Sequence, residues 1–209
     1  MNYYFSDCDT AALAKEYGTP LYVMSEDIII ERLNEIKYSF SEKYKDVQAY
    51  YASKAFLTKE MARIIKREGL GLDVVSGGEL YTARSVDFPM EKIMFHGNNK
   101  THEEIEMALE FGIGRFVCDN FYEIQLINQI AGRTGVKADI LLRVTPGVDS
   151  HTHKYITTGL NENKFGINEQ DLPLTLKTVK SSSNIKLIGI HFHIGSQITD
   201  LTSFENEYQ

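Results

Sequence analysis

The fold is decided by residues 70–118, whose sequence is LGLDVVSGGELYTARSVDFPMEKIMFHGNNKTHEEIEMALEFGIGRFVC. Three apolar runs rich in β-forming residues lie at 70–75, 92–96 and 115–118, and they start 22 and 23 residues apart. Between the last two, Ile105, Ala108 and Leu109 have the apolar spacing of a helix. This stretch therefore predicts strands that alternate with helices.

The same alternation extends to both sides of this stretch. Further strands are predicted at 46–53, 138–145 and 186–194, and helical spacing occurs at Met61, Ile64, Ile65, Ile124, Ile127 and Ile130. Four Ser, Thr or Asn residues precede a glutamate by three positions, which is the spacing of a capping box: Ser76/Glu79, Thr101/Glu104, Asn120/Glu123 and Thr202/Glu205. Glycines that can take positive φ are expected to end helices at Gly69, Gly112 and Gly132.

Repeated strand–helix units give parallel strands, in either an open doubly wound sheet or a closed (β/α)8 barrel. No dinucleotide-binding GxGxxG motif follows an early strand, so we favour the TIM (β/α)8 barrel. Six predicted strands are fewer than the eight of a barrel, and the chain is expected to be an N-terminal fragment of a longer protein. A helix at 10–17, ended by Gly18, and a strand-like segment at 20–24 do not fit the repeat. We therefore expect residues 1–24 to belong to another layer and residues 25–209, starting with a helix that Ser25 caps and that runs to about Tyr44, to form the partial barrel.

Composition limits the partners. The net charge of −7 disfavours nucleic acid and anionic membranes, and a small polar metabolite is the expected partner. No apolar run approaches a membrane span, and the first residues lack the pattern of a signal peptide, which predicts a cytoplasmic protein. Cys8 and Cys118 are far apart and outside any CxxC pattern, so free thiols are expected.

Residues able to do chemistry gather at the predicted strand ends: Lys54, Asp73, His96, Arg143, His191 and His193. Lys54 could form a Schiff base with a carbonyl cofactor if the barrel mouth buries it, or an ion pair with a neighbour such as Asp73. His193 could stack on a cofactor ring, could fill the core, or could bind zinc together with His191. Ser196 could bind a phosphate, whereas Ser76 is interpreted as a helix cap.

Six ordered segments resemble the diaminopimelate decarboxylase family, within the alanine-racemase-like class of pyridoxal-phosphate enzymes. They are Tyr50-Tyr-Ala-Ser-Lys-Ala55, Gly71-Leu-Asp-Val-Val-Ser-Gly-Gly-Glu79, His96-Gly-Asn-Asn-Lys100, Leu142-Arg-Val-Thr-Pro-Gly147, Lys164-Phe-Gly-Ile167 and His191-Phe-His-Ile-Gly-Ser-Gln197. The resemblance implies a pyridoxal 5'-phosphate cofactor, decarboxylation of meso-2,6-diaminopimelate to L-lysine, and a homodimer. Members of this class pair the barrel with a β-rich domain formed mainly by the C-terminal half and the first residues, which would account for residues 1–24.

The resemblance also implies roles for single residues. Lys54 matches the lysine that binds the cofactor, His193 the histidine that stacks on its ring, and Ser196 a phosphate-binding serine. Matches of less definite role are Asp73, Glu79 and Arg143 around the cofactor, Lys164 near a dimer interface, and His151 and His153 near the mouth. Motifs that the family places in the C-terminal half are missing from these 209 residues, so the fragment alone is expected to be inactive.

Three alternatives remain at this stage. A decarboxylase of arginine, ornithine or carboxynorspermidine would share Lys54 and His193, but the segment from Arg143 to Gly159 looks more like the diaminopimelate enzyme. A non-catalytic pyridoxal-phosphate-binding barrel would lack the extra N-terminal segment and the motif around Ser196. A zinc hydrolase would use His191 and His193 as ligands.

Overall fold

The computed structural model describes residues 3–145 and 165–193. The chain forms two compact units, Met1–Ala49 and Tyr50–Gln209, which are described separately. This division does not test the predicted domain boundary at residue 24, which stays a prediction.

In the first unit, a short antiparallel hairpin of β1 (Tyr4–Phe5) and β2 (Cys8–Asp9) leads into α1 (Thr10–Tyr17). The Asp9 carboxylate accepts hydrogen bonds from the first helical N–H groups of α1, and Gly18, at φ +84°, ends the helix as predicted. The predicted cap Ser25 begins α2 (Glu26–Ile36), which continues as a π-helical turn over Lys37–Ser41. The prediction of a strand-like segment at 20–24 is wrong, because within the described residues this segment pairs with no strand.

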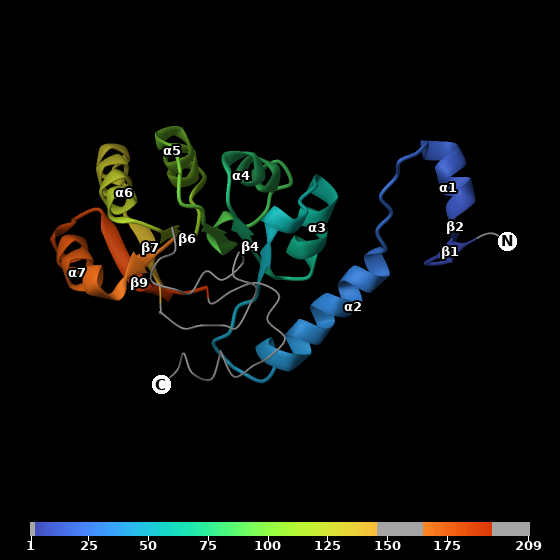
Figure 1. Cartoon of the computed structure of the whole chain (residues 1–209), viewed down its shortest axis with the longest axis horizontal. Helices are drawn as coiled ribbons and strands as arrows, with labels where there is room; N and C mark the ends of the chain where they lie inside the picture. The colour runs from blue at the N-terminus through green and yellow to red at the C-terminus, as the bar shows by residue number, and fades with distance from the viewer. Residues whose placement is uncertain (1–2, 146–164, 194–209) are drawn as a thin grey trace. The chain divides into compact units, whose positions relative to one another are not determined.

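The second unit contains a parallel sheet whose main strands confirm all six predicted runs (Figure 1). They are β3 (Tyr50–Ala52), β4 (Gly71–Val74), β5 (Ile93–Phe95), β6 (Arg115–Cys118), β7 (Ala138–Thr145) and β9 (Ile185–His191). They pair in chain order from β3 to β7, and β9 then pairs with β7. The two-residue β8 (Ile167–Asn168), which was not predicted, pairs with the end of β7.

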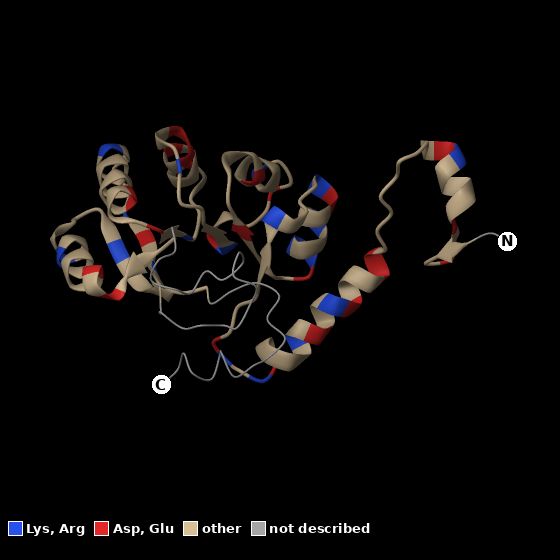
Figure 2. Ribbon diagram, in the orientation of Figure 1, with Lys and Arg blue, Asp and Glu red and all other residues tan. Residues whose placement is uncertain are grey.

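Helices follow the strands in turn, as repeated strand–helix units require. They are α3 (Lys59–Arg67), α4 (Gly77–Arg84), α5 (His102–Phe111), α6 (Phe121–Thr134) and α7 (Leu172–Ser181), with short 3-10 turns at Ser53–Ala55, Met90–Lys92 and Glu169–Asp171. Figure 1 shows α3 to α6 side by side along one side of the strands. Lys, Arg, Asp and Glu are spread over these helices (Figure 2), as expected for elements whose outer sides meet water.

The strands alternate between two environments. Leu72, Val74, Ile140 and Leu142 are fully buried in the core, which also contains apolar residues of α3 to α6. The intervening positions, such as Asp73 and Arg143, point to the opposite face because side chains alternate along a strand. Within the described residues the sheet is open, as expected for part of a barrel.

Glutamate carboxylates accept hydrogen bonds from backbone N–H groups near the helix N-termini in two ways. Thr101 and Glu104 form the predicted capping box of α5, and Glu104 Oε1 also accepts a hydrogen bond from Gly77 N, at the start of α4, at 2.7 Å. Ser76 and Asn120 cap α4 and α6 as predicted, but their glutamates do not return to the cap residue. Glu79 and Glu123 instead accept hydrogen bonds from the residue before the cap, Val75 N at 2.7 Å and Asp119 N at 2.9 Å. The fourth predicted box, Thr202/Glu205, lies outside the described residues.

Of the glycines expected to end helices, two do so and one does not. Gly69 and Gly112 have φ of +81° and +71° at the ends of α3 and α5. Gly132 instead lies inside α6, which ends at Gly135. The reason for glycine at 132 is space, since a Cβ there would lie 2.6 Å from Asn184 Nδ2.

Candidate active site

A cavity of about 270 Å³ opens at the carboxyl ends of the strands, where barrel enzymes place their active sites. Its walls come from five strands of the sheet and the turns that follow them. The lining residues are Lys54, Asp73, Val75, His96, Gly97, Asn98, Arg143, Phe165, His191 and His193. The sequence-predicted chemical residues at the strand ends therefore meet in one place.

Lys54 lies in the 3-10 turn that directly follows β3. Ala52, two residues before the lysine, pairs in register with Asp73 on β4, so the lysine and this aspartate line neighbouring parts of the wall. Lys54 is exposed, so the condition of burial under which its amine would lose a proton readily is not met, while its position at the cavity agrees with its predicted place at a strand end. A turn that carries the lysine just beyond the strand accounts for this exposure.

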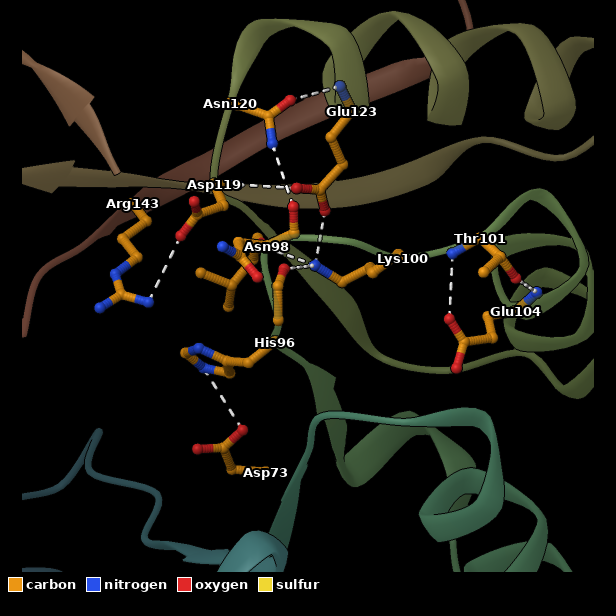
Figure 3. A network of polar contacts seen from close by, with 12 residues as sticks. Asp73, His96, Asn98, Lys100, Thr101, Glu104, Asp119, Asn120, Glu123 and Arg143 are labelled. Carbon is orange, nitrogen blue, oxygen red and sulfur yellow. Dashed lines mark hydrogen bonds and ion pairs between the residues drawn. The ribbon is translucent and has the colours of Figure 1, made fainter. Parts of the chain in front are cut away.

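Asp73, His96 and His191 form a compact polar cluster on the cavity wall. Asp73 Oδ1 lies 3.6 Å from His96 Nε2 (Figure 3), and the His96 and His191 rings meet edge to face with centroids 4.5 Å apart. Burial raises the pKa of Asp73 to about 6 and lowers the pKa of His191 to about 4, and it lowers the pKa of His96 still further. Both imidazoles are therefore neutral near pH 7, and the Asp73–His96 contact is not an ion pair.

Three buried atoms of this cluster have no hydrogen-bond partner among the described residues: Asp73 Oδ1, His96 Nε2 and His191 Nδ1. An unpaired buried polar atom costs free energy, so native structures normally satisfy such atoms. Three of them on one cavity wall fit a site whose ligand is polar and supplies the missing partners.

The cationic side chains favour a ligand with anionic groups. Arg143, on β7, lines the cavity together with Lys54. The Arg143 guanidinium is held by Asp119, with Nη1 at 3.3 Å from Oδ1, and lies 5.0 Å from the centroid of the Phe165 ring. A fixed guanidinium binds carboxylate or phosphate oxygens well because its N–H groups form a planar fork.

His193 lines the same cavity, two residues beyond His191. Burial lowers the pKa of His193, with the Arg143 charge as the next cause, so the ring is held neutral. A neutral, half-buried imidazole beside a cationic wall can pack flat against an aromatic ligand.

The sequence-predicted site residues divide into three groups. Lys54, Asp73, Arg143 and His193 line the cavity together with His96 and His191. Glu79 does not line the cavity. Its carboxylate accepts a hydrogen bond from the backbone N–H of Val75, and Val75 does line the cavity. Ser196, Lys164, His151 and His153 lie outside the described residues.

A polar network that was not predicted from the sequence lies behind the cavity wall (Figure 3). Lys100 Nζ donates to Gly97 O at 2.7 Å, Val117 O at 2.9 Å and Glu123 Oε1 at 2.5 Å. The side chains of Lys100 and Glu123 are almost completely buried. The only sequence signal was the position of Lys100 at the end of the His-Gly-Asn-Asn-Lys motif, where a lysine would ordinarily be assigned to the surface.

Residues 27–209 match the family model "Pyridoxal-dependent decarboxylase, pyridoxal binding domain", and the chain belongs to this family. Its cofactor is pyridoxal phosphate. The curated relatives include diaminopimelate decarboxylases of Bacillus methanolicus, 51% identical over 94% of this chain and 46% of the relative, and of Bacillus subtilis, 50% identical over 94% and 45%. The chain thus spans about half the length of the curated relatives it matches.

Solved structures agree with this assignment. The diaminopimelate decarboxylase of M. jannaschii in co-complex with L-lysine has a TM-score of 0.87 and 38% identity, covering 97% of this chain and 48% of that chain. The Helicobacter pylori enzyme complexed with L-lysine has a TM-score of 0.84 and 32% identity, covering 95% and 50%. The open sheet described above therefore corresponds to the N-terminal part of the barrel of these enzymes.

Metal ligands, cysteines and membrane helices can also be compared with the sequence predictions. The described residues contain no group of three or more His, Cys, Asp or Glu side chains arranged to hold a metal ion. Cys8 and Cys118 are free thiols, as expected. In the described part of the chain, no helix has both the length and the apolar character needed to cross a bilayer.

Proposed function

We propose that the full-length protein containing this chain is a pyridoxal-phosphate-dependent carboxy-lyase that converts meso-2,6-diaminopimelate into L-lysine and CO2, the last step of lysine biosynthesis. The observation that supports this proposal best is the cavity, which Lys54, Arg143 and His193 line together with three buried atoms that have no partner in the described part of the chain. A cofactor with a carbonyl group, an aromatic ring and a phosphate would use such a set of side chains.

Lys54 is the residue proposed to hold the cofactor covalently through its Nζ amine. Its turn places it at the cavity, where the amine would bond to the carbonyl carbon of the cofactor and remain within reach of a substrate. His193 is proposed to lie against the cofactor ring, because its neutral imidazole needs no counter-ion there. Ser196 is proposed to bind the phosphate, as the family resemblance implies.

The reaction breaks the bond between Cα of the substrate and its carboxylate carbon. CO2 leaves, the electron pair of the bond stays on the substrate, and a proton is added at Cα. The cofactor supplies the electron sink for that pair when it is bound. The side chains of this chain orient the reactants: Arg143 offers a fixed cation to an anionic group, and Asp73, whose pKa is raised to about 6, can change its protonation near neutral pH.

The choice of diaminopimelate rests on the relatives. Curated relatives near 50% identity are diaminopimelate decarboxylases, and two similar structures were solved with L-lysine, the product of this reaction. A lysine/ornithine decarboxylase from Vibrio vulnificus is only 23% identical, so its similarity concerns the fold alone.

The test uses the purified full-length protein with pyridoxal phosphate. Release of CO2 and formation of L-lysine from meso-2,6-diaminopimelate are expected, and little turnover of L-ornithine or L-arginine. A Lys54→Ala variant serves as the control for background reaction. Faster turnover of ornithine or arginine than of diaminopimelate would contradict the proposed substrate.

We also propose a cytoplasmic homodimer, which the family resemblance and the sequence support. Sedimentation of the full-length protein should give a mass of two chains. A monomeric mass at concentrations where the enzyme is active would contradict this proposal.

A further inference from the structure

Lys100 is buried in an unusual way for a lysine. It lies in the turn between β5 and α5, and its side chain is only 1% exposed. Burying an ammonium group is costly unless all of its protons find acceptors. Lys100 Nζ has three protons and donates to three acceptors: the carbonyls of Gly97 and Val117, and Glu123 Oε1.

These acceptors belong to three different parts of the fold. Gly97 is in the turn after β5, Val117 is in β6, and Glu123 is in the first turn of α6. The Gly97 backbone has φ of +100°, a conformation open to glycine, and its carbonyl is fixed by the Lys100 ammonium at 2.7 Å. The single ammonium group therefore joins two strand ends and a helix start.

From Glu123 the network continues to the cavity. Glu123 Oε2 accepts a hydrogen bond from Asp119 N at 2.9 Å. Asp119 Oδ1 in turn accepts a hydrogen bond from Arg143 Nη1 at 3.3 Å (Figure 3). The network thus ends at two lining residues, Gly97 on one side and Arg143 on the other. Lys100 and Glu123 themselves do not line the cavity.

We propose that Lys100 and Glu123 form a positioning pair that sets the Gly97 turn and, through Asp119, the Arg143 guanidinium for cofactor binding. This inference rests on the proposed role of the cavity as the cofactor site. Stability alone does not require such a pair, because buried ion pairs are often replaced by apolar residues at little cost. An arrangement that ends at two cavity-lining groups is what a positioning role requires.

The experiment compares two variants of the full-length protein, Lys100→Met and the double variant Lys100→Met/Glu123→Leu. Melting temperature is measured without cofactor, and pyridoxal phosphate affinity is measured by fluorescence titration. Burial raises the pKa of Glu123 and the Lys100 ammonium opposes that rise, so the single variant leaves a carboxyl without its counter-charge and should melt lower. The double variant removes both groups and should recover most of the melting temperature. In both variants the affinity should stay weaker by about tenfold, the lower end of the effect seen in metal sites when the groups that orient the ligands are lost.

Ile130→Ala is the matched control, because Ile130 is fully buried in the same helix as Glu123 but belongs to the apolar core. It should lower the melting temperature and leave the affinity for pyridoxal phosphate unchanged. Affinity that returns in the double variant together with the melting temperature, or an equal loss of affinity in Ile130→Ala, would overturn the positioning role.

The Asp119→Asn variant tests the positioning role independently if the Lys100 variants fail to fold. It removes the charge that holds Arg143 and leaves the Lys100–Glu123 pair in place, and it should also weaken the affinity. Unchanged affinity in Asp119→Asn would overturn the proposal. Since the readout is cofactor affinity, the comparison decides the positioning role even if the unchanged protein releases no CO2 from diaminopimelate, which is the result that would overturn the proposed function.

Discussion

Lys54 is the residue on which the proposed chemistry depends. Its place after β3 and at the cavity predicts that borohydride reduction of the full-length protein with pyridoxal phosphate will fix the cofactor on Lys54. Peptide mapping by mass spectrometry identifies the modified lysine. Lys100, which is buried behind the wall, is the internal control and should stay unmodified. Modification of any other lysine would contradict the assignment.

His193 and His191 both line the cavity but differ in depth. His191 is the last residue of β9 and is engaged edge to face with His96, whereas His193 lies two residues, up to roughly 6.6 Å, beyond the strand end. His193→Ala should therefore weaken cofactor binding or turnover more than His191→Ala does. Titration of pyridoxal phosphate into both full-length variants measures the difference. Equal effects, or a larger effect of His191→Ala, would count against the proposed stacking.

Asp73 makes a pH-dependent contribution to stability. Its pKa rises from 3.8 to about 6 on folding, so the folded protein holds this proton more tightly than the unfolded chain does. The resulting stabilisation is present below pH 3.8 and is lost as the pH rises through about 6. At pH 8, Asp73→Asn should raise the free energy of unfolding of the cofactor-free, full-length protein by roughly 1 to 3 kcal/mol, the scale of such a shift after screening.

The measurement for Asp73 is urea denaturation at two pH values. The gain from Asp73→Asn should be large at pH 8 and should shrink toward pH 4. An equal gain at both pH values would show that the ionisation of Asp73 is not the cause.

At the scale of elements, Gly132 allows a test in which two effects oppose each other. Alanine favours a helix interior by about 1 kcal/mol over glycine. A Cβ at this position would, however, lie 2.6 Å from Asn184 Nδ2, which donates to Asn128 O at 3.2 Å. We expect the clash to win, so Gly132→Ala should destabilise the protein by about 1 to 3 kcal/mol, as overpacking does.

The control for Gly132 is the double variant Gly132→Ala/Asn184→Ala. Removal of the Asn184 amide makes room for the new methyl group, so the second substitution should cost less in the presence of the first than alone. Thermal or urea unfolding of the four full-length proteins gives this comparison. Costs that simply add would show that the two positions do not interact.

Elements were predictable from the sequence where local chemistry decides them. The six main strands could be recognised because each carries apolar residues, many of which enter the core, and Ser76, Thr101 and Asn120 begin helices because their side chains cap N–H groups. The two-residue β8 could not be predicted, since its pairing with β7 depends on a contact between distant segments. The segment 20–24 shows the reverse, an apolar run without a partner strand among the described residues.

The site was predictable in part for the same reason. Lys54, Asp73, Arg143 and His193 were found because strand ends of a parallel sheet meet at one edge. Lys100 was not, because a lysine in a turn is normally solvated and its three acceptors come from segments apart in the sequence. The turn that leaves Lys54 exposed likewise follows from the backbone after β3 and not from the residue type.

For the whole molecule, the open sheet has a consequence for residues 1–209 expressed alone. Within the described residues, β3 ends the sheet on one side, and unpaired strand edges invite self-association. This chain by itself should be poorly soluble or aggregated and should release no CO2 from diaminopimelate. Co-expression with the remaining part of the full-length protein should restore a soluble, active complex. A compact monomer with a cooperative melt, or measurable CO2 release by the chain alone, would contradict this expectation.

The Glu104 carboxylate has a consequence for how such a barrel can be recombined. One of its oxygens completes the capping box of α5, and the other accepts the N–H of Gly77 at the start of α4. Two successive strand–helix units therefore share one side chain across their seam. A chimaera that takes either unit from a distant homologue would leave Gly77 N without this acceptor unless position 104 came with it. Crossover points that keep this shared contact lie outside residues 76–111, so that α4 and α5 stay together.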